Sequence, residues 1–218
     1  MKKYELTNET ITIDNGKTLR RIRAIMDIEA FGVKIGDLGG YIEKEENLSH
    51  YGDAWVYGDA RVYDNAKVFG DARVSGYASV SGYASVYGHA WVFGNASVSG
   101  YAEVDGVTRV FDNALASDNA WVFDNAFVYG NAKVYGDAWV SGDAEVYGNA
   151  RIFDNAWVYD DASVCGNASV YGDAWVYGHA FVYGNAEVSG DALVSGDSEV
   201  SDGDINQMTF EEKGERRI

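Results

Sequence analysis

The sequence predicts an all-β fold, a left-handed parallel β-helix in which three six-residue units form one triangular coil, preceded by a small N-terminal β cap. From Val56 to Val200 an aliphatic residue recurs every six positions, with alanine two positions before most of them. An even period suits strands whose side chains alternate inward and outward, and it does not match the 3.6-residue turn of a helix. The 218 residues contain no proline, which would remove ladder hydrogen bonds from strands with neighbours on both sides.

Each unit reads valine, an aromatic residue or serine, glycine or aspartate, asparagine or aspartate, alanine, and a variable residue. Ala116 and Ile152 replace the valine, and Thr108 and Ser198 replace the alanine. The glycine–aspartate, glycine–asparagine and aspartate–asparagine pairs tolerate the backbone conformations of tight turns. Each unit therefore predicts one short strand and one corner, with valine filling the interior and alanine fitting where the corner leaves little room.

These units resemble those of a known superfamily. Residues 56–61 (VYGDAR) and 146–151 (VYGNAR) are similar to units of the hexapeptide-repeat superfamily, which includes bacterial acyltransferases. The resemblance implies a left-handed β-helix. The segment that leads into the repeat, from Arg23-Ala24-Ile25 to residues 36–42 (GDLGGYI), further resembles the start of uncharacterised bacterial and phage or prophage hexapeptide-repeat proteins.

Both ends depart from the repeat, and we expect three parts: an N-terminal β-hairpin cap over residues 1–50, the β-helix over 51–203, and a C-terminal cap or tail over 204–218. Apolar-polar alternation on both sides of residues 14–17 (DNGK) predicts a hairpin with Asn-Gly at its tip. A solenoid exposes an apolar cross-section at each end, so a cap is needed. His50 stands in the phase of the interior valines, as a transition residue. We expect Ile205, Met208 and Phe210 to cover the other mouth or to pair with a second subunit.

The charge is concentrated on the repeat. The formal net charge is −17, and residues 51–203 hold 6 basic and 21 acidic side chains. Such a surface repels nucleic acid and anionic lipid, so we expect neither as a direct ligand, and a partner with a basic surface fits better. The lone Cys165 excludes an internal disulfide. We find no signal peptide and no membrane-spanning run, which predicts a cytoplasmic protein, in the host cytoplasm if it is phage-encoded.

A coil of 18 residues places residue n next to residue n+18, at a strand spacing of about 4.8 Å. One outward column then holds four tryptophans, Trp121, Trp139, Trp157 and Trp175. A corner column of asparagines, from Asn95 to Asn185, has a structural interpretation, because stacked amides hydrogen-bond along a column. The tryptophan column has two open interpretations: plain stacking, or a contact surface for a partner or a second copy. It is the best candidate binding surface in the sequence.

Acidic residues also align at two corners. Asp137, Asp173 and Asp191 share one column with Asn155, and Asp143, Asp161 and Asp197 share another with His179. A solvated acidic face is the default interpretation. The alternatives are an anionic surface that imitates nucleic acid, or loose binding of a divalent cation. No calcium-loop spacing occurs, so we expect no metal site.

The superfamily resemblance raises the question of catalysis. It implies trimers with a histidine base, an acyl-CoA groove between rods, and often a loop that interrupts the repeat. Here the units run from Val56 to Val200 without an insertion, and His89 and His179 occupy corner positions where asparagine or aspartate is usual. Cys165 stands where other units have serine or tyrosine, without a cation nearby in sequence to activate it. We therefore expect no catalytic residue and no cofactor.

The sequence favours a non-enzymatic acidic β-solenoid that binds a protein partner through its regular outer faces. The phage-like leading segment and the charge suggest a phage or prophage factor that inhibits a host nucleic-acid-binding or defence protein by nucleic-acid mimicry. The alternatives are an acyl-CoA-dependent acyltransferase and a self-assembling scaffold, with a possible homo-oligomer. An ice-binding rod would present threonine arrays, and this repeat has only Thr108.

Overall fold

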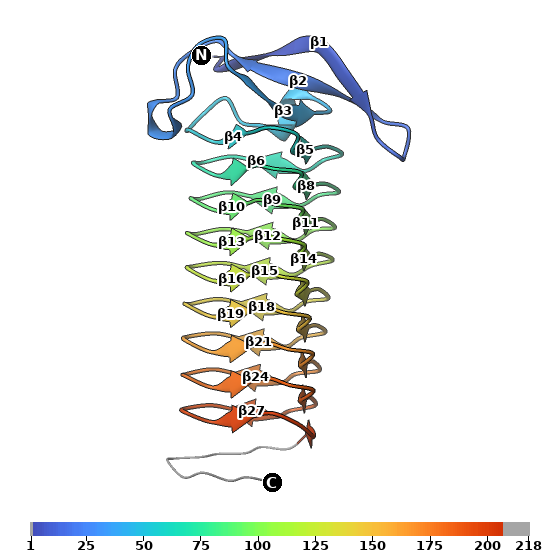
Figure 1. Cartoon of the computed structure of the whole chain (residues 1–218), viewed down its shortest axis with the longest axis vertical. Coiled ribbons are helices and arrows are strands. Elements are labelled where there is room, and N and C mark those ends of the chain that lie inside the picture. Colours follow the sequence, from blue (N-terminus) through green and yellow to red (C-terminus); the bar gives the residue numbers. More distant parts are fainter. Residues whose placement is uncertain (1, 207–218) are drawn as a thin grey trace.

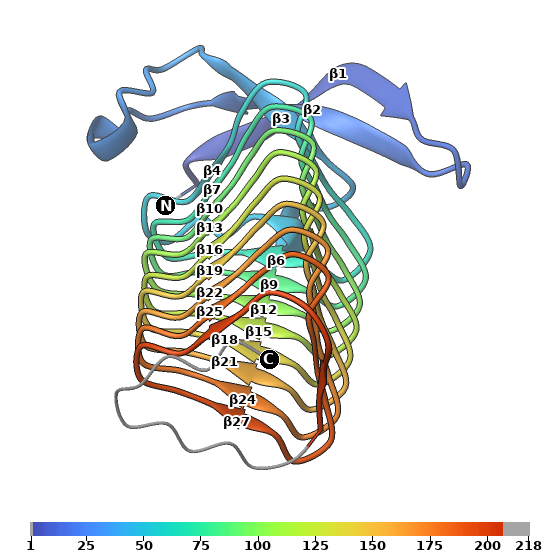
Figure 2. The ribbon, with the colours of Figure 1, turned by 60° about the horizontal axis from the view of Figure 1, so that its bottom comes forward.

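The repeat forms a parallel β-solenoid with three faces in the computed structural model, which describes residues 2–206. Each unit supplies a two-residue strand followed by a corner, and each strand pairs with the strand 18 residues further on. Trp139, for example, pairs with Trp157, and Val140 with Val158. Figure 1 shows the coils stacked below the N-terminal hairpin, and Figure 2 shows them superposed along one prism. The predicted parallel β-helix with three units per coil is therefore confirmed.

The strands form three sheets, one for each face. The first sheet has twelve strands: β1 (Tyr4–Thr12), β2 (Thr18–Ala24), β3 (Leu38–Ile42), β5 (Arg61–Val62), β8 (Ser79–Val80), β11 (Ser97–Val98), β14 (Leu115–Ala116), β17 (Lys133–Val134), β20 (Arg151–Ile152), β23 (Ser169–Val170), β26 (Glu187–Val188) and β29 (Asp204–Ile205). The second has nine: β4 (Trp55–Val56), β7 (Arg73–Val74), β10 (Trp91–Val92), β13 (Arg109–Val110), β16 (Phe127–Val128), β19 (Glu145–Val146), β22 (Ser163–Val164), β25 (Phe181–Val182) and β28 (Glu199–Val200). The third has eight: β6 (Lys67–Val68), β9 (Ser85–Val86), β12 (Glu103–Val104), β15 (Trp121–Val122), β18 (Trp139–Val140), β21 (Trp157–Val158), β24 (Trp175–Val176) and β27 (Leu193–Val194).

The interior is built from the valine and alanine positions, as the repeat predicts. Nearly all of these residues are fully buried, and they form one continuous core along the rod. The corner position two after valine has a positive φ, which glycine adopts without strain. At Gly100 there is also no room for a side chain, because an added Cβ would lie 2.7 Å from the backbone nitrogen of Asp118 in the next coil.

Six aspartates take the same left-handed corner conformation, with φ between 56° and 61°. Each carboxylate accepts a hydrogen bond from the backbone N–H of a glycine 18 residues on, as Asp118 does from Gly136 at 3.3 Å and Asp112 from Gly130 at 3.2 Å. Aspartate tolerates this backbone region better than most residues with a side chain. The aspartate therefore supplies a side-chain acceptor for the backbone N–H of the next coil.

The N-terminal cap extends the first sheet beyond the rod. β1 and β2 pair antiparallel, with Gly16 at a φ of 82° in the turn that joins them, which confirms the hairpin. β2 then pairs antiparallel with β3, and β3 pairs in parallel with β5 of the solenoid. The hairpin projects sideways past the rod at this end (Figures 1 and 2). One sheet thus runs without interruption from cap to rod.

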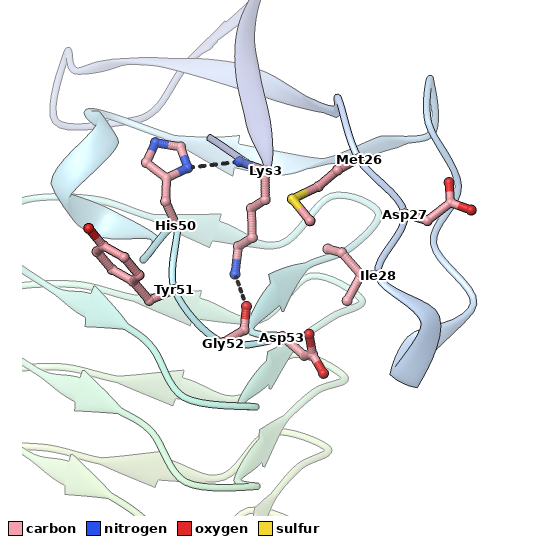
Figure 3. A pocket seen from close by; sticks show the side chains of 8 residues that line it. All are labelled: Lys3, Met26, Asp27, Ile28, His50, Tyr51, Gly52 and Asp53. Atoms are coloured by element: carbon pink, nitrogen blue, oxygen red, sulfur yellow. Dashed lines mark hydrogen bonds between the residues drawn. The ribbon is translucent and has the colours of Figure 1, made fainter. Parts of the chain in front are cut away.

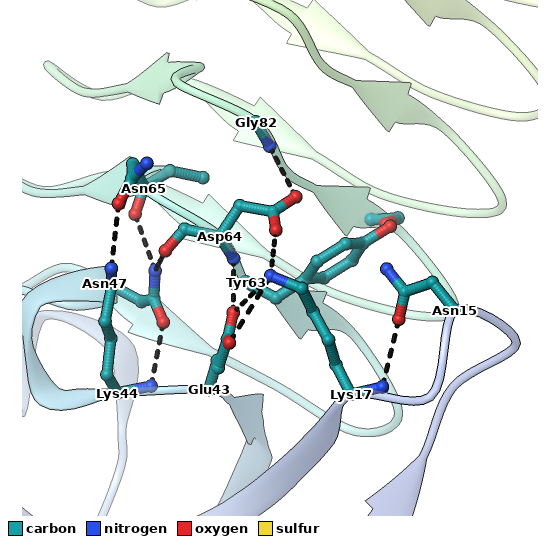
Figure 4. Close-up of polar contacts among 11 residues, drawn as sticks. Asn15, Lys17, Glu43, Lys44, Asn47, Tyr63, Asp64, Asn65 and Gly82 are labelled. Carbon is teal, nitrogen blue, oxygen red and sulfur yellow. Dashed lines mark hydrogen bonds and ion pairs between the residues drawn. The ribbon is translucent and has the colours of Figure 1, made fainter.

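Polar contacts join the cap to the first coils (Figure 4). Lys17, at the hairpin turn, pairs with the carboxylates of Glu43 and Asp64. Glu43 also accepts a hydrogen bond from the backbone N–H of Asp64 at 2.6 Å, and Asp64 accepts one from the N–H of Gly82 at 3.1 Å. Burial opposes ionisation of Asp64, but the hydrogen bonds from Lys17 and Gly82 outweigh burial and lower its pKa.

The last strand breaks the period. β29 pairs with β26 so that Asp204 lies opposite Glu187, a spacing of 17 residues instead of 18. Its Ile205 packs against the core in register with Val188. Met208 and Phe210, which we expect at the mouth of the solenoid, lie outside the described residues.

Candidate binding surface

The four predicted tryptophans form a stacked ladder on the third sheet. Their ring centroids are separated by 4.9, 4.6 and 5.3 Å along the rod, and neighbouring planes differ by 15° or less. The stack follows from the parallel pairing of β15, β18, β21 and β24, which sets identical side chains one strand spacing apart. The ladder ends at Leu193, whose strand β27 pairs with β24.

The stacking determines which part of each indole faces outward. The faces of Trp139 and Trp157 are covered by their neighbours in the ladder, so these rings present their edges to the surface. Trp121 and Trp175, at the two ends, are the most exposed, at 38% and 39%. Among residues 2–206, no acceptor is bound to an indole N–H of the ladder, whereas Trp91 on the second sheet donates to Ser75 at 2.9 Å. The ladder is therefore an apolar strip with free N–H donors along its edge.

Both predicted acidic columns border this ladder. The corners that precede the ladder strands carry Asp137, Asp173 and Asp191, and the corners that follow them carry Asp143, Asp161 and Asp197. The structure therefore places all ten predicted residues on one side of the solenoid. We call this side, the tryptophan ladder with its two bordering corners, the acidic–aromatic face.

Four further carboxylates on these corners were not among the sequence-predicted site residues: Asp118 and Asp154 on one side, and Asp124 and Asp160 on the other. They occupy the left-handed corner position, where aspartate alternates with glycine. Counting both corner positions over residues 118–197 would have found them, because the period fixes which corner each residue joins. The two corners hold ten carboxylates over this stretch.

The third corner, between the second and first sheets, is different. There the asparagine column forms a continuous ladder from Asn95 to Asn185, in which each amide donates to the next carbonyl oxygen at 3.0–3.1 Å. Over residues 112–185 this corner has one carboxylate, Asp112. The acidic–aromatic face has no lysine or arginine between residues 117 and 126, or at the equivalent positions of the next four coils. Charge is thus strongly partitioned around the rod.

Asparagine amides in the acidic columns donate hydrogen bonds to neighbouring aspartates. Asn119 donates to Asp137 at 2.8 Å, and Asn125 donates to Asp143 at 3.0 Å. His179 lies with its Nδ1 3.7 Å from Asp161, and His89 has the equivalent relation to Asp71 at 3.6 Å. Each rod histidine therefore lies beside the carboxylate one coil earlier.

Cys165 directly follows strand β22 of the second sheet, in the column of aromatic residues at the third corner, and is 8% exposed. The pKa of Tyr147 is raised mainly by its hydrogen bond with the thiol of Cys165, and burial of the ring raises it further. Cys165 occupies the repeat position after the valine, where other units have serine, as the sequence predicts.

A cavity of about 290 Å³ lies between the cap and the first coil, lined by Lys3, Met26, Ile28, His50 and Asp53 among others (Figure 3). Lys3 is only 2% exposed, and its Nζ donates to the carbonyl oxygen of Gly52 at 3.1 Å. Burial lowers the pKa of Lys3 to about 8. His50 accepts a hydrogen bond at Nδ1 from the backbone N–H of Lys3, and burial lowers its pKa as well. These contacts hold the first strand on the rod.

Two further features of residues 2–206 bear on function. No helix in this part of the chain has the length and apolar character that a membrane crossing requires. Within the same residues, no three histidine, cysteine, aspartate or glutamate side chains are grouped as they would be around a metal ion.

The fold and the repeat define this protein as a β-solenoid repeat protein of the hexapeptide type. A family model described as YdcK beta solenoid repeat matches residues 126–142, 144–160 and 180–202. These segments include Trp139 and Trp157 of the ladder but not Trp121 or Trp175. No curated protein matches the chain.

Proposed function

We propose that this protein is a non-catalytic docking rod that binds a basic protein partner on the acidic–aromatic face. The observation that supports this function is the pairing of an exposed aromatic ladder with ten bordering carboxylates and no lysine or arginine. Carboxylate rows attract and orient a cationic partner, and apolar ring edges supply contact area once water is excluded. The smooth run of units from β4 to β28 offers a long regular surface.

The finer hypothesis concerns the partner. Two rows of carboxylates on a rigid rod suit a groove that normally accepts the phosphates of a nucleic acid, so the partner would be a host nucleic-acid-binding or defence protein held by mimicry. The resemblance of the leading segment to phage and prophage proteins supports such a role. An excess of a duplex oligonucleotide should then compete with the rod for its partner, and the absence of competition would contradict mimicry while leaving docking intact.

The docking function can be tested with a short oligo-arginine peptide as the probe, by tryptophan fluorescence and calorimetry. We expect saturable binding that weakens as salt rises, because exposed charge pairs are screened. The matched variants are D154N and D112N. Both aspartates adopt the left-handed corner and accept from a glycine N–H, at 3.3 and 3.2 Å, but only Asp154 borders the ladder.

D154N should weaken binding about two- to fivefold, the range of one exposed charge pair, and D112N should leave it unchanged. Equal effects of the two substitutions would show only general attraction to an acidic protein. An absence of binding at low salt would refute the docking function.

A further inference from the structure

The spacing and orientation of the ladder carry information about the shape of the partner. From Trp121 to Trp175 the ring centroids span about 15 Å in three nearly equal steps. A partner that packs along the ladder must present apolar side chains with a matching repeat. The repeat of a polypeptide side chain along its axis depends on its secondary structure, so the candidates can be compared by arithmetic.

An extended strand fits poorly. Its side chains on one face recur about every 6.7 Å, so they fall out of register with the rings after one step. An α-helix rises about 1.5 Å per residue, which places residues i, i+3, i+7 and i+10 at about 0, 4.5, 10.5 and 15 Å along its axis. These positions follow the four rings closely. A second copy of this rod has the same coil spacing, but it would bring two carboxylate-rich faces together, and like charges repel.

The orientation of the tryptophan rings determines where basic side chains of a partner can bind on this face. A cation–π contact needs access to a ring face, and the faces of Trp139 and Trp157 are covered by neighbours at 4.6–5.3 Å. Cations of a partner therefore belong on the two carboxylate rows that border the ladder. An occupant with apolar side chains in the middle and basic side chains on both flanks satisfies the whole face.

Resting on the proposed docking function, we infer that the acidic–aromatic face accepts an amphipathic α-helix. Its apolar residues at i, i+3, i+7 and i+10 pack on the edges of the tryptophan ladder. Lysine or arginine side chains on both sides of this apolar stripe pair with the corner carboxylates, such as Asp137 and Asp173 on one side and Asp143 and Asp161 on the other. The helix lies along the rod axis, and its apolar stripe ends near Leu193.

Two synthetic peptides of identical leucine and lysine composition test this inference. In the first, leucine occupies the a and d positions of a heptad and lysine the e and g positions; in the second, leucine and lysine alternate with the period of a strand. Titration calorimetry and circular dichroism on the full chain report affinity and helix content. We expect the first peptide to bind at least tenfold more tightly than the second and to gain helicity on binding.

Protein variants locate the site. The double substitution W139S/W157S should weaken binding of the helical peptide at least tenfold. The matched control is F111S/Y129S, which interrupts the stacked column that directly follows the second-sheet strands β13 and β16. Centroids there are also 4.8–5.0 Å apart, but this corner carries the asparagine ladder. This control should leave affinity unchanged. Serine occurs in both columns, at Ser85 and Ser75, so the fold accommodates it.

The outcomes separate the two proposals. Equal affinity for both peptides, or binding of the helical peptide without a gain of helicity, would overturn the helix inference and leave docking of a basic partner standing. An equal loss of affinity in F111S/Y129S would also overturn it, because the site would then not be the ladder. Failure of both peptides and of oligo-arginine to bind would overturn the docking function itself.

Discussion

The side-chain amide of Asn155 donates a hydrogen bond to the carboxylate of Asp173, with 2.9 Å between Nδ2 and Oδ1. The column therefore alternates from Asp137 through Asn155 to Asp173, and a neutral donor separates charges that would otherwise lie one strand spacing apart. The amide of Asn155 thus keeps Asp137 and Asp173 two strand spacings apart.

The substitution N155D would remove this separation and place four carboxylates in succession, from position 137 to position 191. Directly opposed like charges cost up to about 1 kcal/mol, so we expect the thermal midpoint to fall by about 2–4 °C. The loss should shrink in 1 M salt, which screens charges beyond about 3 Å. N149D, which also loses an amide donor but lies between neutral Asn131 and Asn167, is the control. Equal losses in the two variants at low salt would contradict the electrostatic explanation.

Alanine substitutions at two corner glycines can distinguish the cost of a left-handed backbone from the cost of steric crowding between coils. Gly58 and Gly100 have φ values of 58° and 67°, but an added Cβ meets its nearest atom at 3.7 Å at Gly58 and at 2.7 Å at Gly100. G58A should cost only the left-handed penalty of about 1–2 kcal/mol, and G100A should lower the thermal midpoint at least twice as much, because the next coil must move. Differential scanning calorimetry compares them, and equal midpoints would show that coil spacing adjusts freely.

The buried amine of Lys3 should make the stability of the cap pH-dependent. Its pKa falls from 10.5 to about 8 on folding, so between these values the unfolded chain binds more protons and stability rises with pH. K3M removes the titrating group. The melting temperature of the wild type should therefore rise relative to that of K3M between pH 7 and pH 9.5. A constant difference over this range would show that the amine is not buried in the folded protein.

The hairpin depends on the lysine at its turn. Lys17 bonds to Asp64 and Glu43, and the hydrogen bond to Asp64 is the main reason that its pKa is raised. K17M should increase amide hydrogen exchange in β1 and β2 and leave the coils beyond β8 unchanged. K34M is a suitable control, since Lys34 pairs with Asp27 within the cap itself. Unchanged exchange in the hairpin of K17M would contradict a role for this lysine in fastening the cap.

The features that follow from the 18-residue coil could be predicted from the sequence. The coil of three units, the tryptophan ladder and the asparagine ladder all follow from adding 18 to a residue number, and the structure has each of them. The contacts of Lys3 with Gly52 and of Lys17 with Asp64 could not be predicted, because no period relates a cap residue to a coil. The 17-residue step to β29 was also beyond prediction, because Ile205 keeps its interior place through a shortened corner that breaks the repeat.

Corner chemistry was only partly predicted. The sequence shows aspartate alternating with glycine at the left-handed position, but the bond from Asp118 to the N–H of Gly136 depends on how far apart two coils lie. Each of these aspartates has glycine 18 residues later, and the backbone N–H of that glycine is the donor. This left-handed corner position also places four aspartates on the acidic–aromatic face: Asp118, Asp124, Asp154 and Asp160.

Indole resonances provide the most direct measurement, because all six tryptophans report separately. Four lie in the ladder, while Trp55 is buried and Trp91 packs under Arg73 on the second sheet. In a ¹H–¹⁵N correlation spectrum titrated with oligo-arginine, the Nε1–H signals of Trp121, Trp139, Trp157 and Trp175 should shift while those of Trp55 and Trp91 stay fixed. A shift of Trp91 as large as those of the ladder, or no shift in any ladder signal, would contradict the acidic–aromatic face as the docking surface.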